Sequence, residues 1–249
     1  VSGVAVVAAL SSCHSDQGVR ASGAKGRRIK RIASNSYAVN RLFKRSRPST
    51  RPETLALRKK YGEITMLDFP QFTRDTYAGV TTMDLWSSLF GDAQDDTQFS
   101  SQDVGGRYRR REFDPSRPSA KRYLDKLAAN MASTGVRAQH VSNNAPRNLA
   151  DLDEEKREEG IRVAKIWLDA CQQIGVKSMR VNTGGPRIIP PSEIKGGYPQ
   201  NTAIVPYLKS AIEAFKVLAG HGEKVGVKVT IENHWGLAAE PMNVRIILN

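Results

Sequence analysis

The chain has 249 residues, of which 39% are hydrophobic and 25% charged, so its composition is that of a globular protein with one large domain or two small ones. Its formal net charge of +13 would suit a nucleic-acid-binding protein, but residues 1–60 hold 14 Lys or Arg against two acidic residues, and the remainder holds 24 against 23. The body of the protein is therefore close to neutral, and we expect no nucleic-acid partner, because binding to a phosphate backbone requires a basic face.

The N-terminal segment resembles part of an export signal. Residues 1–10 (VSGVAVVAAL) form an apolar run that is too short to cross a bilayer as a helix and resembles the second part of a signal-peptide core whose charged start is missing. The run leads into Leu10-Ser11-Ser12-Cys13, which is similar to a lipoprotein signal box, in which the cysteine is lipidated and becomes the mature N-terminus. We therefore expect residues 1–13 to be the remainder of a signal peptide, and the protein to be exported, either periplasmic or anchored to a membrane by a lipid at Cys13. An ordinary cleaved signal peptide and a buried apolar segment are the alternatives.

The next stretch, residues 14–31, is rich in Ser, Gly, Ala and basic residues, and this composition is typical of a flexible linker. It belongs to a basic arm that includes Arg27, Arg28, Lys30 and Arg31. Such an arm is either a solvated tail or a tether held near an anionic surface.

From residue 32 onward, short β-type runs alternate with longer helical runs. The expected strands are residues 32–40, 80–86, 136–142, 177–182 and 227–233. The expected helices are residues 119–134, a stretch that begins at Asp151 as N-cap and is ended by Gly175, and residues 206–224, with residues 242–249 as a further helix. Because no Asn-Gly or Asp-Gly hairpin turn separates the strands, this order indicates parallel βαβ units.

Strand alternation favours a closed barrel over an open sheet. In the fifth strand Val229 and Ile231 share one face, while Lys228, Thr230 and Glu232 share the other. Strands of an open parallel sheet tend to be apolar on both faces, whereas a barrel strand turns one face to the helices and the other to the barrel interior. We therefore predict an incomplete TIM (β/α)8 barrel over residues 32–249, with about five of the eight βα units present.

Polar residues collect where the expected strands end. They are Asn40, Asp84, Trp86, His140, Arg180, Asn182 and Glu232, followed by His234 in the fifth loop. Amides and Arg bind hydroxyls and carboxylates, and a metal-bound carboxylate can polarise a carbonyl, so this set suits a polyhydroxylated or anionic small molecule. We predict that Asn40, Trp86, His140, Arg180, Asn182 and His234 bind the substrate, with Trp86 stacking on a sugar face. We expect Glu232 to be functional, because a carboxylate buried at a strand end needs a cation or a proton.

Several strand ends resemble one known family. Ile231-Glu232-Asn233-His234-Trp235-Gly236 is similar to the fifth-strand motif of the sugar phosphate isomerase/epimerase family, which has xylose isomerase-like TIM barrels. The fourth-strand segment 177–185 (KSMRVNTGG), together with segments 36–40 and 140–144, gives supporting resemblances, and the likeness extends over residues 32–249.

The resemblance implies a divalent metal, Mn²⁺, Mg²⁺, Co²⁺ or Zn²⁺, held by four side chains. Glu232 matches the Glu that ends strand five, and it is implied to be both a metal ligand and a catalytic residue. The other three ligands, from strands six to eight, have no counterpart before Asn249, so we expect a fragment that is inactive alone.

The leading function is accordingly a metal-dependent isomerase or epimerase acting on a sugar or a sugar-like polyol. A lyase, dehydratase or hydrolase of sugar derivatives on the same barrel is an alternative, and so is a carbohydrate-binding barrel without catalysis. An abasic-site endonuclease shares the barrel, but its His-rich zinc centre fits poorly with four histidines and a nearly neutral body.

Overall fold

In the computed structural model, residues 29–45, 48–103, 109–185, 194–195, 198–199, 203–234 and 236–249 are described. The apolar run, Cys13 and nearly all of the expected linker lie outside these residues, and so does Trp235 of the fifth-strand motif.

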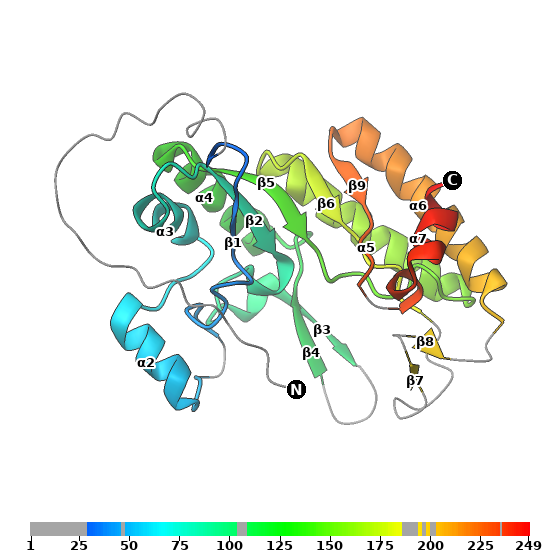
Figure 1. Cartoon of the computed structure of the whole chain (residues 1–249), viewed down its shortest axis with the longest axis horizontal. Helices are drawn as coiled ribbons and strands as arrows, with labels where there is room; N and C mark the ends of the chain where they lie inside the picture. The colour runs from blue at the N-terminus through cyan, green and yellow to red at the C-terminus, as the bar shows by residue number, and fades with distance from the viewer. Residues whose placement is uncertain are drawn as a thin grey trace.

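The core of the fold is one five-stranded parallel sheet whose strands follow chain order, β1-β2-β5-β6-β9 (Figure 1). These strands are β1 (Ser34–Asn35), β2 (Thr82–Trp86), β5 (Arg137–Ser142), β6 (Ser178–Arg180) and β9 (Lys228–Thr230). Each lies inside a segment expected to be a strand, and all four neighbouring pairs are parallel. The predicted partial barrel is therefore confirmed as a fold of parallel βα units.

The helices α4 (Pro118–Thr134), α5 (Glu154–Gln173) and α6 (Val205–Val225) connect successive strands of the sheet and pack on one side of it (Figure 1). They match the expected helices closely, and α7 (Pro241–Leu248) follows β9. The predicted N-cap of α5 was wrong by two residues: Asp153, not Asp151, accepts a hydrogen bond from the backbone of Lys156. Gly175 has a φ of 74° just after this helix, in the left-handed conformation that ends it.

The first strand is much shorter than residues 32–40. The Asn35 side-chain oxygen accepts hydrogen bonds from the backbone N–H groups of Tyr37 and Ala38, at 2.7 and 3.3 Å. Such an Asn turn competes with strand pairing, so the chain leaves the sheet at this point. Asn40 consequently lies five residues beyond the strand and not at its end.

Between β1 and β2 lie the helices α2 (Pro52–Tyr61) and α3 (Phe69–Thr76). Short 3-10 helices occupy η1 (Ser87–Leu89), η2 (Asp96–Gln98) and η4 (Gly236–Ala239). In the part of the chain that is described, no helix is long and apolar enough to cross a membrane.

Among the described residues, two antiparallel hairpins are inserted after strands of the main sheet, and neither was predicted. One consists of β3 (Phe99–Asp103) and β4 (Arg109–Phe113), after β2, and the other of β7 (Ile194–Lys195) and β8 (Tyr198–Pro199), after β6. The first is anchored by its aromatic residues, because the Phe113 ring lies 5.9 Å from the Trp167 ring of α5, centre to centre. It projects beyond the carboxyl end of β2 (Figure 1).

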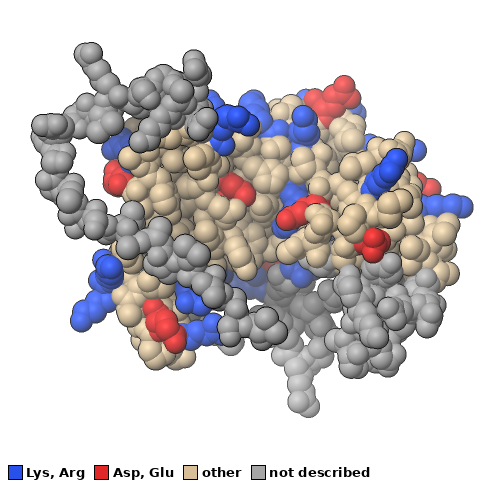
Figure 2. Space-filling view, viewed as in Figure 1, with Lys and Arg blue, Asp and Glu red and all other residues tan. Residues whose placement is uncertain are grey.

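The two faces of the sheet differ as the strand alternation predicted. Met83, Leu85, Val141 and Met179 are fully buried against the helices and form the centre of the core. The opposite face carries polar side chains, which are described below. Over the described body, Figure 2 shows Lys and Arg interspersed with Asp and Glu on the face in view, in agreement with a body close to neutral.

Candidate functional site

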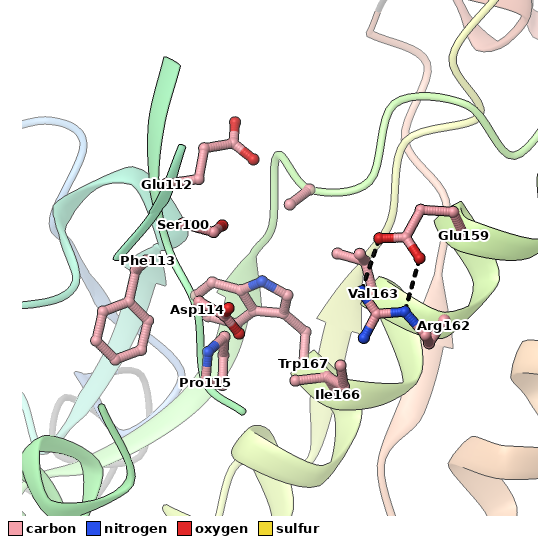
Figure 3. Close-up of a pocket in the computed structure, with 11 residues that line it drawn as sticks. Ser100, Glu112, Phe113, Asp114, Pro115, Glu159, Arg162, Val163, Ile166 and Trp167 are labelled. Carbon is pink, nitrogen blue, oxygen red and sulfur yellow. Dashed lines mark hydrogen bonds and ion pairs between the residues drawn. The ribbon is translucent and has the colours of Figure 1, made fainter. Parts of the chain in front are cut away.

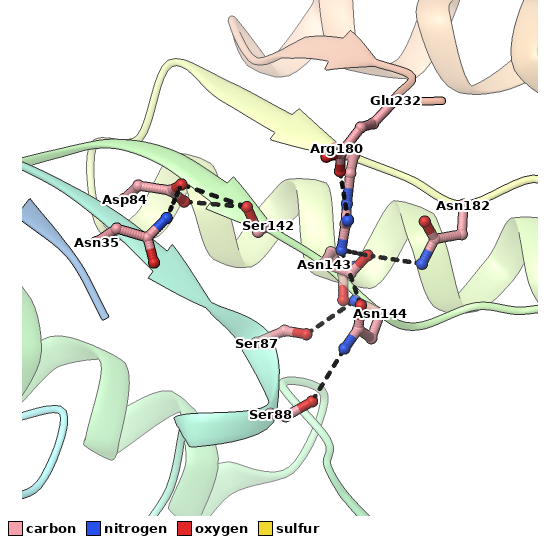
Figure 4. A network of polar contacts seen from close by, with 10 residues as sticks. All are labelled: Asn35, Asp84, Ser87, Ser88, Ser142, Asn143, Asn144, Arg180, Asn182 and Glu232. Atoms are coloured by element: carbon pink, nitrogen blue, oxygen red, sulfur yellow. Dashed lines mark hydrogen bonds and ion pairs between the residues drawn. The ribbon is translucent and has the colours of Figure 1, made fainter. Parts of the chain in front are cut away.

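The polar face begins with a cluster around Asp84 in the middle of β2. The Asp84 carboxylate accepts hydrogen bonds from the Asn35 amide of β1 at 2.8 Å and from the Ser142 hydroxyl of β5 at 3.1 Å (Figure 4). Three neighbouring strands therefore contribute to one cluster. Sequence reasoning placed Asp84 correctly but missed Asn35, which occupies the inward position that Asn40 was expected to fill. Asn40 instead donates its side-chain amide to the Tyr37 carbonyl at 2.5 Å.

His140 lies next to Asp84 in register on β5, and its Nδ1 is 2.8 Å from the Ser178 hydroxyl of β6. Burial lowers the pKa of His140 below its ordinary value, and the Arg180 guanidinium adds to this effect, while Asp84 and Glu232 oppose it. The imidazole is therefore neutral at pH 7 and can accept or donate a proton on the inner face.

Arg180, at the end of β6, is the centre of a second cluster. Its Nη1 donates to the Glu232 carboxylate at 2.6 Å, and its Nη2 donates to the Asn144 side-chain oxygen at 2.8 Å and to the Asn143 carbonyl at 3.3 Å (Figure 4). The residue is 6% exposed, so the guanidinium is fixed inside the protein rather than on its surface. Arg180 thus supplies a cation of the kind that a carboxylate at this place was expected to need.

Glu232 itself is placed differently from the expectation. Because β9 ends at Thr230, Glu232 lies two residues beyond the strand, and its side chain is 51% exposed. The prediction that the Glu232 carboxylate is buried at the end of a strand was therefore wrong. What distinguishes Glu232 is its contact with a buried cation, which orients the carboxylate at the carboxyl edge of the sheet.

The loop after β5 holds Arg180 from the other side. The Asn144 backbone N–H donates to the Ser87 hydroxyl at 2.9 Å, and the Asn144 side-chain amide donates to the Ser88 hydroxyl at 3.3 Å. Asn182, 4% exposed, donates to the Asn143 carbonyl at 3.4 Å. Contacts thus run from the end of β2 through the β5 loop and β6 to the end of β9. The two serines were missed because nothing in their sequence context marks them.

The other predicted residues lie at the margin of this face. Trp86 ends β2, with the Tyr37 ring edge-on at 4.9 Å and the Arg45 guanidinium 5.8 Å from the indole centre. His234 is exposed in the loop after β9. The structure therefore brings together Asp84, His140, Arg180, Asn182 and Glu232, and leaves Asn40 outside the group.

The Gly-Gly loop after β6 is a packing element. Gly184 and Gly236 have φ values of 70° and 67°, and a Cβ on Gly184 would lie 1.9 Å from the Arg147 carbonyl oxygen, while one on Gly236 would lie 2.0 Å from the Gly184 oxygen. Three loops thus touch through their backbones, and the Leu237 N–H donates to the Gly184 carbonyl at 3.0 Å. The loop is a tight turn whose glycines allow this close approach of the backbones.

A metal centre is not complete among the described residues. They contain no group of three or more His, Cys, Asp or Glu side chains close enough to hold an ion. Glu232 is the one expected ligand present, and a guanidinium contacts it. The described residues by themselves therefore do not complete a site for a divalent metal.

Comparison with known proteins agrees with the fold. The family model described as "Xylose isomerase-like TIM barrel" matches residues 103–246, more than half of the chain. The chain belongs to this family.

Solved structures with a similar fold include 3-keto-D-glucoside 4-epimerase from E. coli, at 13% identity and a TM-score of 0.47, with 83% of this chain and 64% of that chain covered. A D-tagatose 3-epimerase-like protein is similar at 14% identity and a TM-score of 0.46, and the match covers 75% of this chain and 59% of that chain. A D-psicose 3-epimerase is similar at 13% identity and a TM-score of 0.46, and the match covers 76% of this chain and 58% of that chain. The chain thus spans about six tenths of the length of these proteins. No curated protein sequence matches it.

Proposed function

We propose that this chain is part of a sugar isomerase or epimerase and that the sugar binds on the polar inner face, at the carboxyl ends of the parallel strands. The observation that carries the proposal is the continuous set of contacts from Ser87 through Asn144 and Arg180 to Glu232. In parallel βα folds, ligands bind at this edge, because the loops and strand ends of successive units converge there.

The chemistry of the face suits proton transfer next to a carbonyl. Glu232 is an exposed carboxylate held in one orientation, and His140 is a neutral imidazole on the same face, so each is able to take up a proton from substrate. Arg180, fixed and cationic, favours negative charge that develops on an adjacent oxygen. Asp84, with its bonds from Asn35 and Ser142, offers a further acceptor for sugar hydroxyls.

The divalent metal stays a prediction. When bound, such an ion polarises a carbonyl or hydroxyl oxygen, and Glu232 is the ligand that this chain would contribute.

Sugar binding by the 249-residue chain tests the location of the site. D-fructose, D-psicose and D-xylose should each bind with Glu232-dependent affinity in NMR titrations, and Glu232→Gln should weaken binding by about 10-fold, the scale of a charged hydrogen bond. Glu213→Gln, which changes an exposed carboxylate on α6, serves as the matched control and should leave affinity unchanged. Equal affinity in wild type and both variants would remove the sugar site from this face.

The type of reaction is tested by measuring turnover in a longer protein, in which three further βα units complete the eight-unit barrel. In D₂O with added Mn²⁺, Mg²⁺, Co²⁺ or Zn²⁺, an isomerase or epimerase should exchange the hydrogen next to the carbonyl without losing water. Release of water, detected as an unsaturated or deoxy product, would favour a lyase or dehydratase instead. Glu232→Gln in this form should lower the rate at least about 100-fold and weaken metal binding, since it removes a proton-transfer group and a ligand while keeping side-chain shape.

A further inference from the structure

A pocket outside the sheet face lies between the β3–β4 hairpin and α5 (Figure 3). Its volume is about 180 Å³, roughly six times a water molecule's share of the liquid. It is smaller than the pockets of roughly 300–1,000 Å³ that enclose drug-sized ligands, so it suits only a small molecule. None of its lining residues belongs to the proposed sugar site.

The floor of the pocket is aromatic and carries one available donor. Phe113 and Trp167 form it and are 5% and 3% exposed. In Figure 3 the indole nitrogen of Trp167 points toward the open centre of the pocket. Among the described residues this N–H has no hydrogen-bond acceptor, and it is not one of their fully buried unpaired atoms, so it is accessible from the pocket. A ligand oxygen in the pocket would supply the acceptor.

The walls and the mouth carry charges of both signs that are already balanced. Asp114 lies 3.3 Å from Arg117, and Glu112 lies 3.9 Å from Arg147. These carboxylates are 25% and 17% exposed, so they remain able to accept hydrogen bonds inside the pocket.

At the mouth, Arg162 donates to both oxygens of Glu159 at 2.6 and 2.7 Å (Figure 3). Because each carboxylate has a guanidinium beside it, the pocket has little net attraction for an ion. It presents strong acceptors and strong donors around an apolar floor.

We infer that this pocket binds a small neutral polyhydroxylated molecule, a short polyol or a single monosaccharide ring. Hydroxyl groups donate to the carboxylates of Glu112, Asp114 and, at the mouth, Glu159, and they accept from the Trp167 N–H, while the C–H surface of the ligand covers the aromatic floor. A hydrocarbon forms hydrogen bonds with neither the carboxylates nor the Trp167 N–H, and an organic cation has no oxygen that must accept from that N–H. This inference does not depend on the proposed function.

The pocket also borders the loop after β5, which holds Arg180 at the polar face of the sheet. Ala145 lines it, and the preceding residue, Asn144, holds Arg180. An occupant of the pocket therefore contacts the loop that positions the Arg180–Glu232 pair.

The test is a titration of the ¹⁵N-labelled chain with glycerol, D-xylose, choline and benzene, read at the indole N–H resonances. Polyols should shift the Trp167 resonance, assigned by its loss in Trp167→Phe, with a dissociation constant on the order of 1 mM. Trp167→Phe keeps an aromatic ring and removes the N–H donor, so it should weaken polyol binding about 3- to 10-fold. Binding to this variant is measured at the backbone N–H resonances of other residues that line the pocket. Thermal unfolding would show whether this variant keeps its fold.

A second variant avoids the core altogether. Glu159→Gln, at the exposed mouth, should weaken polyol binding by a similar factor, and Glu155→Gln, also exposed on α5 but outside the pocket, should leave it unchanged. The inference is overturned if choline or benzene shifts Trp167 and the polyols do not. It is also overturned if Glu159→Gln and Glu155→Gln bind polyols equally well. Glu232→Gln should leave the affinity of this pocket for polyols unchanged, and this result distinguishes the pocket from the proposed sugar site on the inner face.

Discussion

Substituting Gly184 by Ala tests whether the close contact of the three loops stabilises the fold. The substitution has two costs. A left-handed backbone costs a residue with a Cβ roughly 1–2 kcal/mol. The new methyl would also lie 1.9 Å from the Arg147 carbonyl oxygen and 2.7 Å from its carbon, and overpacking of this kind typically adds about 1–3 kcal/mol. We expect Gly184→Ala to lower the free energy of unfolding by about 2–5 kcal/mol in total.

Gly226→Ala separates the two contributions. Gly226 has the same φ of 70° as Gly184, but nothing lies within 4 Å of the added Cβ, so only the backbone cost of roughly 1–2 kcal/mol applies. Urea unfolding followed by circular dichroism would measure both variants, with unchanged m-values showing that the difference is one of stability. If the two substitutions destabilise the protein equally, the loops are not held by the contact at Gly184, and the packing explanation of the Gly-Gly motif fails.

Three further predictions concern charge, export and sheet edges. Burial lowers the pKa of His140 in the folded state, so as the pH falls the unfolded chain binds a proton before the folded protein does. The stability that comes from neutral His140 is therefore present above pH about 6.5 and is lost as the pH falls below it. His140→Gln should flatten the pH dependence of the melting temperature in that window. If Leu10-Ser11-Ser12-Cys13 is a lipoprotein box, mass spectrometry of the exported protein should find a mature chain that starts at acylated Cys13, and deletion of residues 14–30 should leave sugar binding unchanged; an intact leader would contradict this. Since β1 and β9 each have one neighbour in the described sheet, the 249-residue chain should be poorly soluble and aggregate as its concentration rises, so binding and unfolding are measured on dilute protein; a monodisperse, cooperatively melting monomer at high concentration would argue against open edges.

The sequence was most informative where a repeating pattern controls the structure. The alternation of Met83 and Leu85 with Asp84 located β2 and its two faces, because the same two-residue period decides which side chains meet the helices. Parallel order followed from the helical stretches between strands. The extent of β1 did not follow, because a single side chain, Asn35, forms a turn that no periodicity reveals.

The site was predictable by position but not by environment. His140, Arg180 and Asn182 were placed on the inner face because they follow strand alternation. The exposure of Glu232 depends on where β9 ends, and that end is set by pairing with β6, a contact between distant parts of the chain. The β3–β4 hairpin was missed for a similar reason: its aromatic residues match Trp167 of α5, which lies more than 50 residues further on.

The strict chain order of the sheet has a consequence for biosynthesis. In the described five-stranded sheet, each strand pairs with the sheet strand made before it, so when a new strand leaves the ribosome, its first partner is already present. With synthesis at roughly 5–20 residues per second, several seconds separate successive strands, which is long compared with helix and collapse times. The sheet can therefore grow one strand at a time from β1 to β9, and at each stage the strand made last presents the edge on which the next strand pairs.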